Sequence, residues 1–125
     1  EFDTEKIIKM ALLHDLSESI IGDLTPDKIS KKSKRQKENL AMKQILSNIP
    51  NKISKSYYKI WDEYQNVSSE EAKLVHEIDK LEMVFQAKYY YDKGHSKEKL
   101  RSFFQTANIE IKSKYLREIL SKLLE

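Results

Sequence analysis

Apolar residues recur at helical spacing near the start of the chain. The first group consists of Ile7, Ile8, Ala11 and Leu12. These positions share one broad face of a helix, so we expect a helix whose inner side they form. Asp3 or Thr4 can cap it, because a side-chain oxygen there accepts a hydrogen bond from a free amide of the first turn. The pattern weakens near Leu16, where we expect the helix to end.

Residues 17–26 interrupt the helical repeat and hold one of the two glycines and one of the two prolines. We expect a short turn-rich connection there. A second helix is predicted over about residues 33–49. It ends before Pro50, because proline disfavours helical backbone in the residue before it. The predicted buried residues of this helix are Leu40, Ala41, Ile45 and Ile49.

A third helix is indicated by aromatic and apolar residues at positions i, i+3, i+4 and i+7. They are Tyr57, Ile60, Trp61 and Tyr64. We expect this stripe to pack in the core rather than to bind a cofactor. Ser68 and Glu71 have the spacing of a capping box, which opens the longest predicted helix. That helix is expected to stop before Gly94.

Two further helices complete the predicted fold. The first starts at Ser96, and its expected buried residues are Leu100, Phe103, Phe104 and Ala107. The last helix is expected to bury Tyr115, Leu116, Ile119, Leu120 and Leu123. The pattern therefore predicts an all-α bundle of about six helices, and we expect residues 1–125 to form a single domain.

The composition agrees with an all-α fold and removes several classes of protein. With two glycines and two prolines in 125 residues, the chain lacks the turns of a β-sandwich and the glycine-rich loops of Rossmann and P-loop proteins. The absence of cysteine excludes a disulfide scaffold and a thiolate metal site. No apolar run approaches the roughly 20 residues that cross a membrane, so we expect a soluble, cytoplasmic protein.

The formal net charge is +3, and the basic residues are unevenly placed. Residues 28–37 read KISKKSKRQK, with six basic residues and no acidic one. This run fits a solvated loop that enters an exposed helix. It also fits a rim that attracts an anionic substrate, or a patch that binds nucleic acid. Nucleic-acid binding is the least favoured of the three interpretations, because the run holds no aromatic residue to stack on bases.

Three polar residues interrupt the predicted apolar faces. His14 and Asp15 follow Ala11 by three and four residues, so both continue the inner face of the first helix. Asp79 lies four residues after Val75 on the longest helix. A buried imidazole or carboxylate must be paired or bound to a metal, because burying it alone costs several kcal/mol. The set therefore fits either a divalent cation with mixed N and O ligands or a structural His–Asp network.

Two more acidic residues follow the His14–Asp15 pair. Glu18 lies one helical turn after the pair, so its carboxylate overlooks the same site if the turn persists. Asp23 follows Gly22, which allows the chain to bend back. A carboxylate beside a cation-bound water suits hydrolysis at neutral pH, because the cation lowers the pKa of the water and the acid relays the proton. The alternative is that Glu18 only caps the next turn.

These residues lie in a segment with a recognisable pattern. Residues 10–26, MALLHDLSESIIGDLTP, resemble the signature of the HD-domain metal-dependent phosphohydrolases, and most closely their 5′-deoxynucleotidase branch. Residues 68–87, SSEEAKLVHEIDKLEMVFQA, resemble the later metal-binding helix of that family. The His-Asp doublet, the following acid, the GD-x-TP tail and the Asp79 helix come in the family's order. The resemblance spans most of the chain and implies an HD-domain helical bundle.

The resemblance also implies roles for single residues. His14, Asp15 and Asp79 would ligate a divalent metal cation, such as cobalt, manganese, magnesium or another transition ion. Glu18 would activate or protonate in the chemical step, and Asp23 would contact the substrate or its attacking water. The implied reaction hydrolyses a (deoxy)nucleoside 5′-monophosphate to nucleoside and phosphate. An imidazole in the ligand set favours a transition ion over magnesium.

The chain departs from the family's pattern at two points. The family takes a further ligating histidine and a nucleotide-binding arginine from a helix before the one that opens here at Thr4. We therefore expect that the chain lacks the N-terminal helix of the domain and begins inside it. His76 stands where relatives commonly carry lysine, which suggests either a phosphate contact or a partly exposed helix residue. His95, in the turn after Gly94, is expected at the surface.

The incomplete ligand set keeps a second hypothesis open. In it, the HD fold persists as a binding or structural module that no longer catalyses, because fewer protein ligands weaken metal affinity. A missing helix would also expose the apolar faces of Ile7, Ala11 and their neighbours. Such a surface favours association, so we expect a homodimer.

Overall fold

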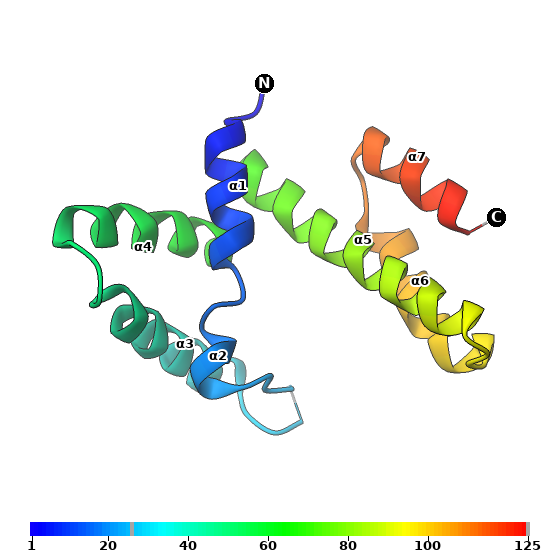
Figure 1. Cartoon of the computed structure of the whole chain (residues 1–125), viewed down its shortest axis with the longest axis horizontal. Helices are drawn as coiled ribbons and strands as arrows, with labels where there is room; N and C mark the ends of the chain where they lie inside the picture. The colour runs from blue at the N-terminus through cyan, green and yellow to red at the C-terminus, as the bar shows by residue number, and fades with distance from the viewer. Residues whose placement is uncertain (26, 125) are drawn as a thin grey trace. The chain divides into compact units, whose positions relative to one another are not determined.

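The computed structural model of the chain describes residues 1–25 and 27–124, and these residues form seven α-helices without a strand (Figure 1). The helices are α1 Thr4–Leu13, α2 Glu18–Ile21, α3 Lys31–Leu46, α4 Asn51–Asn66, α5 Glu70–Asp92, α6 Lys97–Glu110 and α7 Lys114–Leu123. The predicted all-α class is confirmed. No helix among the described residues is both long enough and apolar enough to cross a membrane.

The extra helix, α2, lies in the segment predicted to be a turn-rich connection. It is only four residues long and begins with Glu18. Hydrogen bonds between residues three apart precede it. The Leu16 amide donates to the Leu13 carbonyl at 3.1 Å, and the Glu18 amide donates to the Asp15 carbonyl at 3.0 Å. The helical turn therefore persists past the end of α1, and it stops at Gly22, whose φ of 76° suits glycine. Pro26, the end of the predicted connection, lies outside the described residues.

The chain divides into two compact units, Glu1–Ala72 and Lys73–Glu125. We call them the N-terminal unit and the C-terminal unit and describe each by itself. In the N-terminal unit, α1 and α3 both pack on α4, and α2 packs on α3. Its core is a cluster of four buried residues: Leu13, Met42, Leu46 and Trp61. Trp61 is completely buried, and Tyr57 and Ile60 pack against the cluster, as the third predicted stripe requires.

The buried side of α1 differs from the predicted one. Met10 and Leu13 are buried, whereas Ile8 is 57% exposed, Leu12 is 72% exposed and Ala11 is also exposed. Six of the seven residues from position 7 to position 13 are apolar. Apolar side chains therefore surround the helix, and periodicity alone could not tell which side faces the core.

The inner faces of α3, α6 and α7 are also narrower than predicted. Leu40 is 68% exposed, while Met42 and Leu46 occupy the core of the N-terminal unit. In the C-terminal unit, Phe103, Tyr115 and Ile119 are exposed. The predicted stripes of these three helices therefore include residues that are exposed in the structure.

The C-terminal unit has its own core. Buried residues from α5, α6 and α7 and the short connection after α6 form it: Leu81, Val84, Ala107, Ile111 and Leu120. Polar bonds hold the connection between α6 and α7. The Glu77 carboxylate accepts from the Ser113 amide at 2.9 Å and also from the Lys112 amide. The Arg117 guanidinium donates to the Ile111 carbonyl at 2.8 Å.

The start of α5 corrects the predicted capping box. The Ser69 hydroxyl, not that of Ser68, accepts from a first-turn amide, that of Ala72, at 3.0 Å. The Ser69 hydroxyl also donates to the Glu63 carboxylate at 2.7 Å. The helix ends at Asp92, before Gly94 with φ 99°, as predicted. The His95 amide closes this end by donating to the Tyr90 carbonyl at 3.0 Å.

Candidate active site

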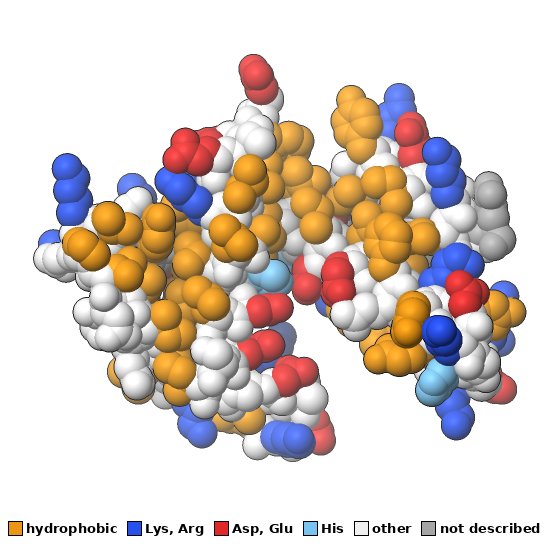
Figure 2. All heavy atoms as spheres, viewed as in Figure 1, with side chains coloured by type: hydrophobic (Ala, Val, Ile, Leu, Met, Phe, Trp, Pro, Cys, Tyr) orange, Lys and Arg blue, Asp and Glu red, His pale blue; other side chains and the backbone are white. Residues whose placement is uncertain are grey.

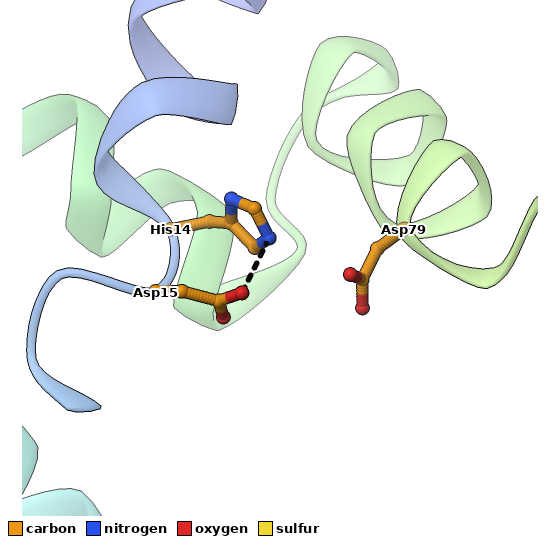
Figure 3. A group of neighbouring side chains, drawn as sticks. All are labelled: His14, Asp15 and Asp79. Atoms are coloured by element: carbon orange, nitrogen blue, oxygen red, sulfur yellow. Dashed lines mark ion pairs between the residues drawn. The ribbon is translucent and has the colours of Figure 1, made fainter. Parts of the chain in front are cut away.

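His14 stands at the C-terminal end of α1, and its ring is held from two sides. The Nδ1 atom lies 2.6 Å from the Ala11 carbonyl oxygen. The ring also meets the buried Tyr64 ring of α4 edge to face, with 5.4 Å between centroids. The His14 side chain is 19% exposed. Packing and the backbone contact therefore fix the direction of the imidazole within the N-terminal unit (Figure 3).

The backbone contact determines which nitrogen of His14 is available. A carbonyl only accepts, so Nδ1 carries the proton and a neutral ring presents its lone pair at Nε2. Nε2 lies 3.0 Å from the Asp15 carboxylate, the pair joined by the dashed line in Figure 3. Two electron-rich atoms this close need a positive charge, either a proton on Nε2 or a bound cation. The pair thus fits a divalent cation with N and O ligands.

Asp15 is less buried than predicted, since its side chain is 60% exposed. The reason is the corrected face of α1: Asp15 continues the exposed Ile8–Leu12 side, while His14 lies beside the buried Met10 and Leu13. The argument that burial forces a partner on Asp15 is therefore wrong. The contact with His14 Nε2 carries the argument in its place.

Glu18 opens α2 one turn after Asp15 and is half-buried. Burial, followed by the neighbouring carboxylates of Asp15 and Asp23, raises the pKa of the Glu18 carboxyl above its ordinary value. The Lys34 ammonium group opposes this effect. Glu18 therefore keeps a proton to a higher pH than an isolated glutamate, which suits proton transfer.

Sequence reasoning missed one member of this group, Glu38 of α3. Burial raises the pKa of the Glu38 carboxyl, Asp15 adds to the rise, and Lys34 and Arg35 oppose it. We call Asp15, Glu18, Asp23 and Glu38 the acidic cluster. Acidic side chains gather around α2 in Figure 2. The sequence does contain one indication of this role. Glu38 is an acidic residue that directly follows the basic run, one helical turn after Lys34.

The basic run itself enters α3, whose first turn is capped by the Ser30 hydroxyl. Its members differ in role. The Arg35 guanidinium donates to Asn66 at 2.9 Å and to Asp62 at 3.3 Å, which ties α3 to α4. Lys34 instead interacts electrostatically with Glu18 and Glu38 of the acidic cluster. Arg35 thus combines a structural contact with an effect on Glu38, whereas Lys34 acts on both Glu18 and Glu38.

Replacing Glu38 with glutamine is expected to stabilise the protein at pH 7. The raised pKa means that the folded state holds this proton more tightly than the unfolded chain. The contribution of Glu38 therefore favours folding below the ordinary value of 4.5 and is lost as the pH rises through the raised value. We expect a gain of up to about 1 kcal/mol at pH 7, limited by solvent screening, and a smaller one at pH 4.

Urea unfolding at the two pH values checks this expectation, with Glu118→Gln as the control. Glu118 is an exposed glutamate of α7, and we expect its replacement to change the free energy of unfolding equally little at both pH values. A Glu38→Gln protein with the wild-type free energy of unfolding at pH 7 would contradict the electrostatic account.

The remaining predicted site residues lie in loops and on α5. Asp23 is exposed and follows Gly22. Asp79 projects from α5 (Figure 3). It is half-buried in the C-terminal unit, where Val75 one turn earlier is buried. His76 is half-buried as well. His95 is exposed, as predicted, and its ring meets that of Tyr90 edge to face at 5.3 Å between centroids.

Curated relatives are similar in sequence to this chain over most of its length. The 5'-deoxynucleotidase HDDC2 of Dictyostelium discoideum is 44% identical over 110 residues, which are 85% of this chain and 58% of that protein. The human 5'-deoxynucleotidase HDDC2 is 40% identical over 82% of this chain and 50% of its own length. The 5'-deoxynucleotidase YGK1 of Saccharomyces cerevisiae is 33% identical over 98% of this chain and 59% of its own length. The chain thus spans about half the length of these relatives.

A solved structure agrees with the sequence matches. The crystal structure of the PH0347 protein from Pyrococcus horikoshii OT3 has a TM-score of 0.73 and 33% sequence identity to this chain. The match covers 98% of this chain and 67% of that one. The model of a family described as "HD domain" matches residues 1–120. The chain therefore belongs to the HD domain family.

Proposed function

We propose that this chain catalyses the metal-dependent hydrolysis of deoxynucleoside 5′-monophosphates to nucleoside and inorganic phosphate. The observation that carries the proposal is the His14–Asp15 pair, in which Nε2 faces a carboxylate oxygen at 3.0 Å, with Glu18, whose pKa is raised by burial, as its neighbour. Relatives named 5'-deoxynucleotidases, at 33% to 44% identity, support the substrate class.

His14, Asp15 and Asp79 are the proposed ligands of a divalent cation, and each offers one ligand atom. The tautomer fixed by the Ala11 carbonyl suits His14 for this role, because it leaves Nε2 as the donor atom. When bound, a divalent cation supplies an activated water and neutralises charge on the phosphoryl oxygens. Cobalt, manganese and magnesium are all compatible with an N and O ligand set, and the imidazole favours a transition ion.

Glu18 is the proposed proton donor and acceptor. Its raised pKa allows the carboxyl to hold a proton and give it to the departing 5′ oxygen of the nucleoside. Asp15, Asp23, Lys34 and Glu38 all influence that pKa. Asp23 is the proposed contact for the substrate or its attacking water, since it lies close enough to Glu18 to affect its charge.

Cationic side chains are needed for the phosphate dianion of the substrate. Lys34 is the best placed, because it already interacts with Glu18 and Glu38. The other basic residues of the run at positions 28–37 would raise the local concentration of the anion. His76, one turn before Asp79 on α5, is a second proposed phosphate contact.

Replacing Glu18 with glutamine is expected to lower kcat for a deoxynucleoside 5′-monophosphate about 10²- to 10⁴-fold. Glutamine preserves the shape of the side chain but cannot transfer the proton. Because Glu18 is not a proposed metal ligand, the amount of bound metal should stay at the wild-type level. Phosphate release and elemental analysis measure the two quantities. Glu98→Gln, at an exposed position of α6, serves as the control. Wild-type kcat in Glu18→Gln would remove Glu18 from the chemical step.

A binding or structural module without catalysis is the competing proposal. In that case the protein would bind a nucleotide or a metal without releasing phosphate. The two proposals differ in one observable, the release of phosphate from a deoxynucleoside 5′-monophosphate by the natural-length protein. Release that Glu18→Gln abolishes favours the enzyme, and binding without release favours the module.

Homodimer formation in the cytoplasm completes the proposal. Exposed Ile8, Ala11 and Leu12 give α1 an apolar face in the N-terminal unit, which supports association with a second copy. Light scattering is expected to give twice the mass of one chain, and Leu12→Glu should shift the mass toward that of a monomer. A monomeric wild-type protein at micromolar concentration would contradict the dimer.

A further inference from the structure

A pocket in the C-terminal unit has no role in the proposed reaction. Its volume is about 360 Å³, and residues of α5, α6 and α7 line it. The lining residues that matter here are Lys88, Tyr91, Lys97, Arg101, Phe104 and Leu123. In Figure 2, Lys and Arg side chains lie beside apolar ones over the region where α5 ends and α6 begins.

The charge of this pocket is positive and largely uncompensated. Lys97 and Arg101 are one helical turn apart on α6, so they share a face of the helix. No ion pair among the described residues includes either of them, and no aspartate or glutamate is found in the described lining. Lys88 has one acidic neighbour, Asp92, with 3.8 Å between Nζ and Oδ1. Two like charges at this spacing repel each other, and a bound anion would relieve the repulsion.

Apart from Gln105, the rest of the lining is aromatic or aliphatic. Phe104 and Leu123 pack against the core cluster of the C-terminal unit. Tyr91 is 45% exposed, so its ring remains accessible at the pocket. Aromatic and aliphatic walls offer contact area to a flat, apolar group, whereas a hydrated inorganic ion would gain nothing from them. The volume is near the lower end of the range of about 300–1,000 Å³ that small-molecule sites occupy.

We propose that this pocket binds a small organic anion that consists of a flat ring bearing a phosphate or carboxylate group. The anionic group pairs with Lys97 and Arg101, and the guanidinium can bind either group through two parallel hydrogen bonds. The ring lies against Tyr91 and Phe104. None of the pocket's lining residues serves in the proposed reaction.

Calorimetric titration with phenylphosphonate and with benzoate tests the proposal. Neither compound has an ester bond to hydrolyse, and excess chelator keeps metal out of the measurement. We expect saturable binding of at least one of them, and the stronger one identifies the phosphate or the carboxylate source. Inorganic phosphate, which lacks the ring, and benzyl alcohol, which lacks the charge, are expected to bind at least tenfold more weakly.

Two variants locate the binding. Arg101→Gln is expected to weaken it at least tenfold, and Lys97→Gln to weaken it to a smaller extent. Lys99→Gln, an exposed neighbour on α6 outside the lining, should leave it unchanged. All three positions are exposed, so the fold is expected to persist, and circular dichroism checks this. The proposal is overturned if neither ring-bearing anion binds, if inorganic phosphate binds as tightly, or if Arg101→Gln binds like the wild type.

Discussion

Asp79→Asn is expected to lower kcat for a deoxynucleoside 5′-monophosphate at least about 10³-fold and to reduce the bound metal. A carboxylate ligand neutralises a divalent cation, whereas a carboxamide does not, so the proposed site would lose both affinity and charge balance. The expected size follows from the several kcal/mol that a cation contributes to the transition state, since each 1.4 kcal/mol is a factor of ten. Phosphate release and elemental analysis of the purified protein measure the two effects.

Asp92→Asn is the matched control for Asp79→Asn. Asp92 lies on the same helix, α5, its side chain is 60% exposed, and it forms an ion pair with Lys88 at 3.8 Å. We expect its replacement to leave both kcat and metal content unchanged. If Asp79→Asn kept the wild-type metal content and turnover while folding normally, Asp79 would not be a ligand. The combination of normal metal and low turnover would instead move Asp79 to substrate binding.

Trp61→Ala is expected to lower the free energy of unfolding by about 3–5 kcal/mol. Trp61 is completely buried in the core of the N-terminal unit, where it contacts Leu13, Met42 and Leu46. The substitution removes this apolar contact area and leaves a cavity. A loss of this size is a large fraction of the stability of an ordinary domain, so a folded but strongly destabilised protein is expected. Urea unfolding followed by circular dichroism measures it.

Tyr115→Ala provides the comparison for Trp61→Ala. Tyr115 is 77% exposed on α7, so its removal is expected to change the free energy of unfolding by less than about 0.5 kcal/mol. The sequence pattern alone predicts the opposite, because it assigns Tyr115 to the buried stripe. Equal losses in the two variants would show that the burial described here does not govern stability.

Six of the seven helices in the described residues could be predicted from the sequence because each has a strong local signal, whereas the four-residue α2 falls in the predicted connection. Asp3 does cap α1, the Trp61 stripe does pack in a core, and Gly94 does follow the end of α5. The orientation of several helices could not be predicted. Apolar residues surround α1 almost completely, so periodicity does not show that Met10 is buried and Leu12 is exposed. Tertiary contacts, not periodicity, hold that information.

The sequence singled out some of the candidate site residues, but the physical reason it offered differs in part from the one the structure gives. His14 and Asp15 stood out as polar residues on an apolar face, but Asp15 is exposed. Its significance comes from the 3.0 Å contact with Nε2 of a histidine whose tautomer the Ala11 carbonyl fixes. Sequence spacing cannot show a tautomer. Glu38 was missed because it comes from α3, twenty residues after Glu18, and only folding brings it close enough to Asp15 for that carboxylate to raise the pKa of Glu38.

The dependence of phosphate release on a divalent cation tests the central claim most directly. The natural-length protein is treated with excess chelator and assayed with a deoxynucleoside 5′-monophosphate, before and after cobalt, manganese or magnesium is returned. The account predicts that chelation abolishes release and that at least one of these cations restores it, but not in Asp15→Asn or Asp79→Asn. Undiminished release by the wild-type protein and by both variants under excess chelator would contradict it.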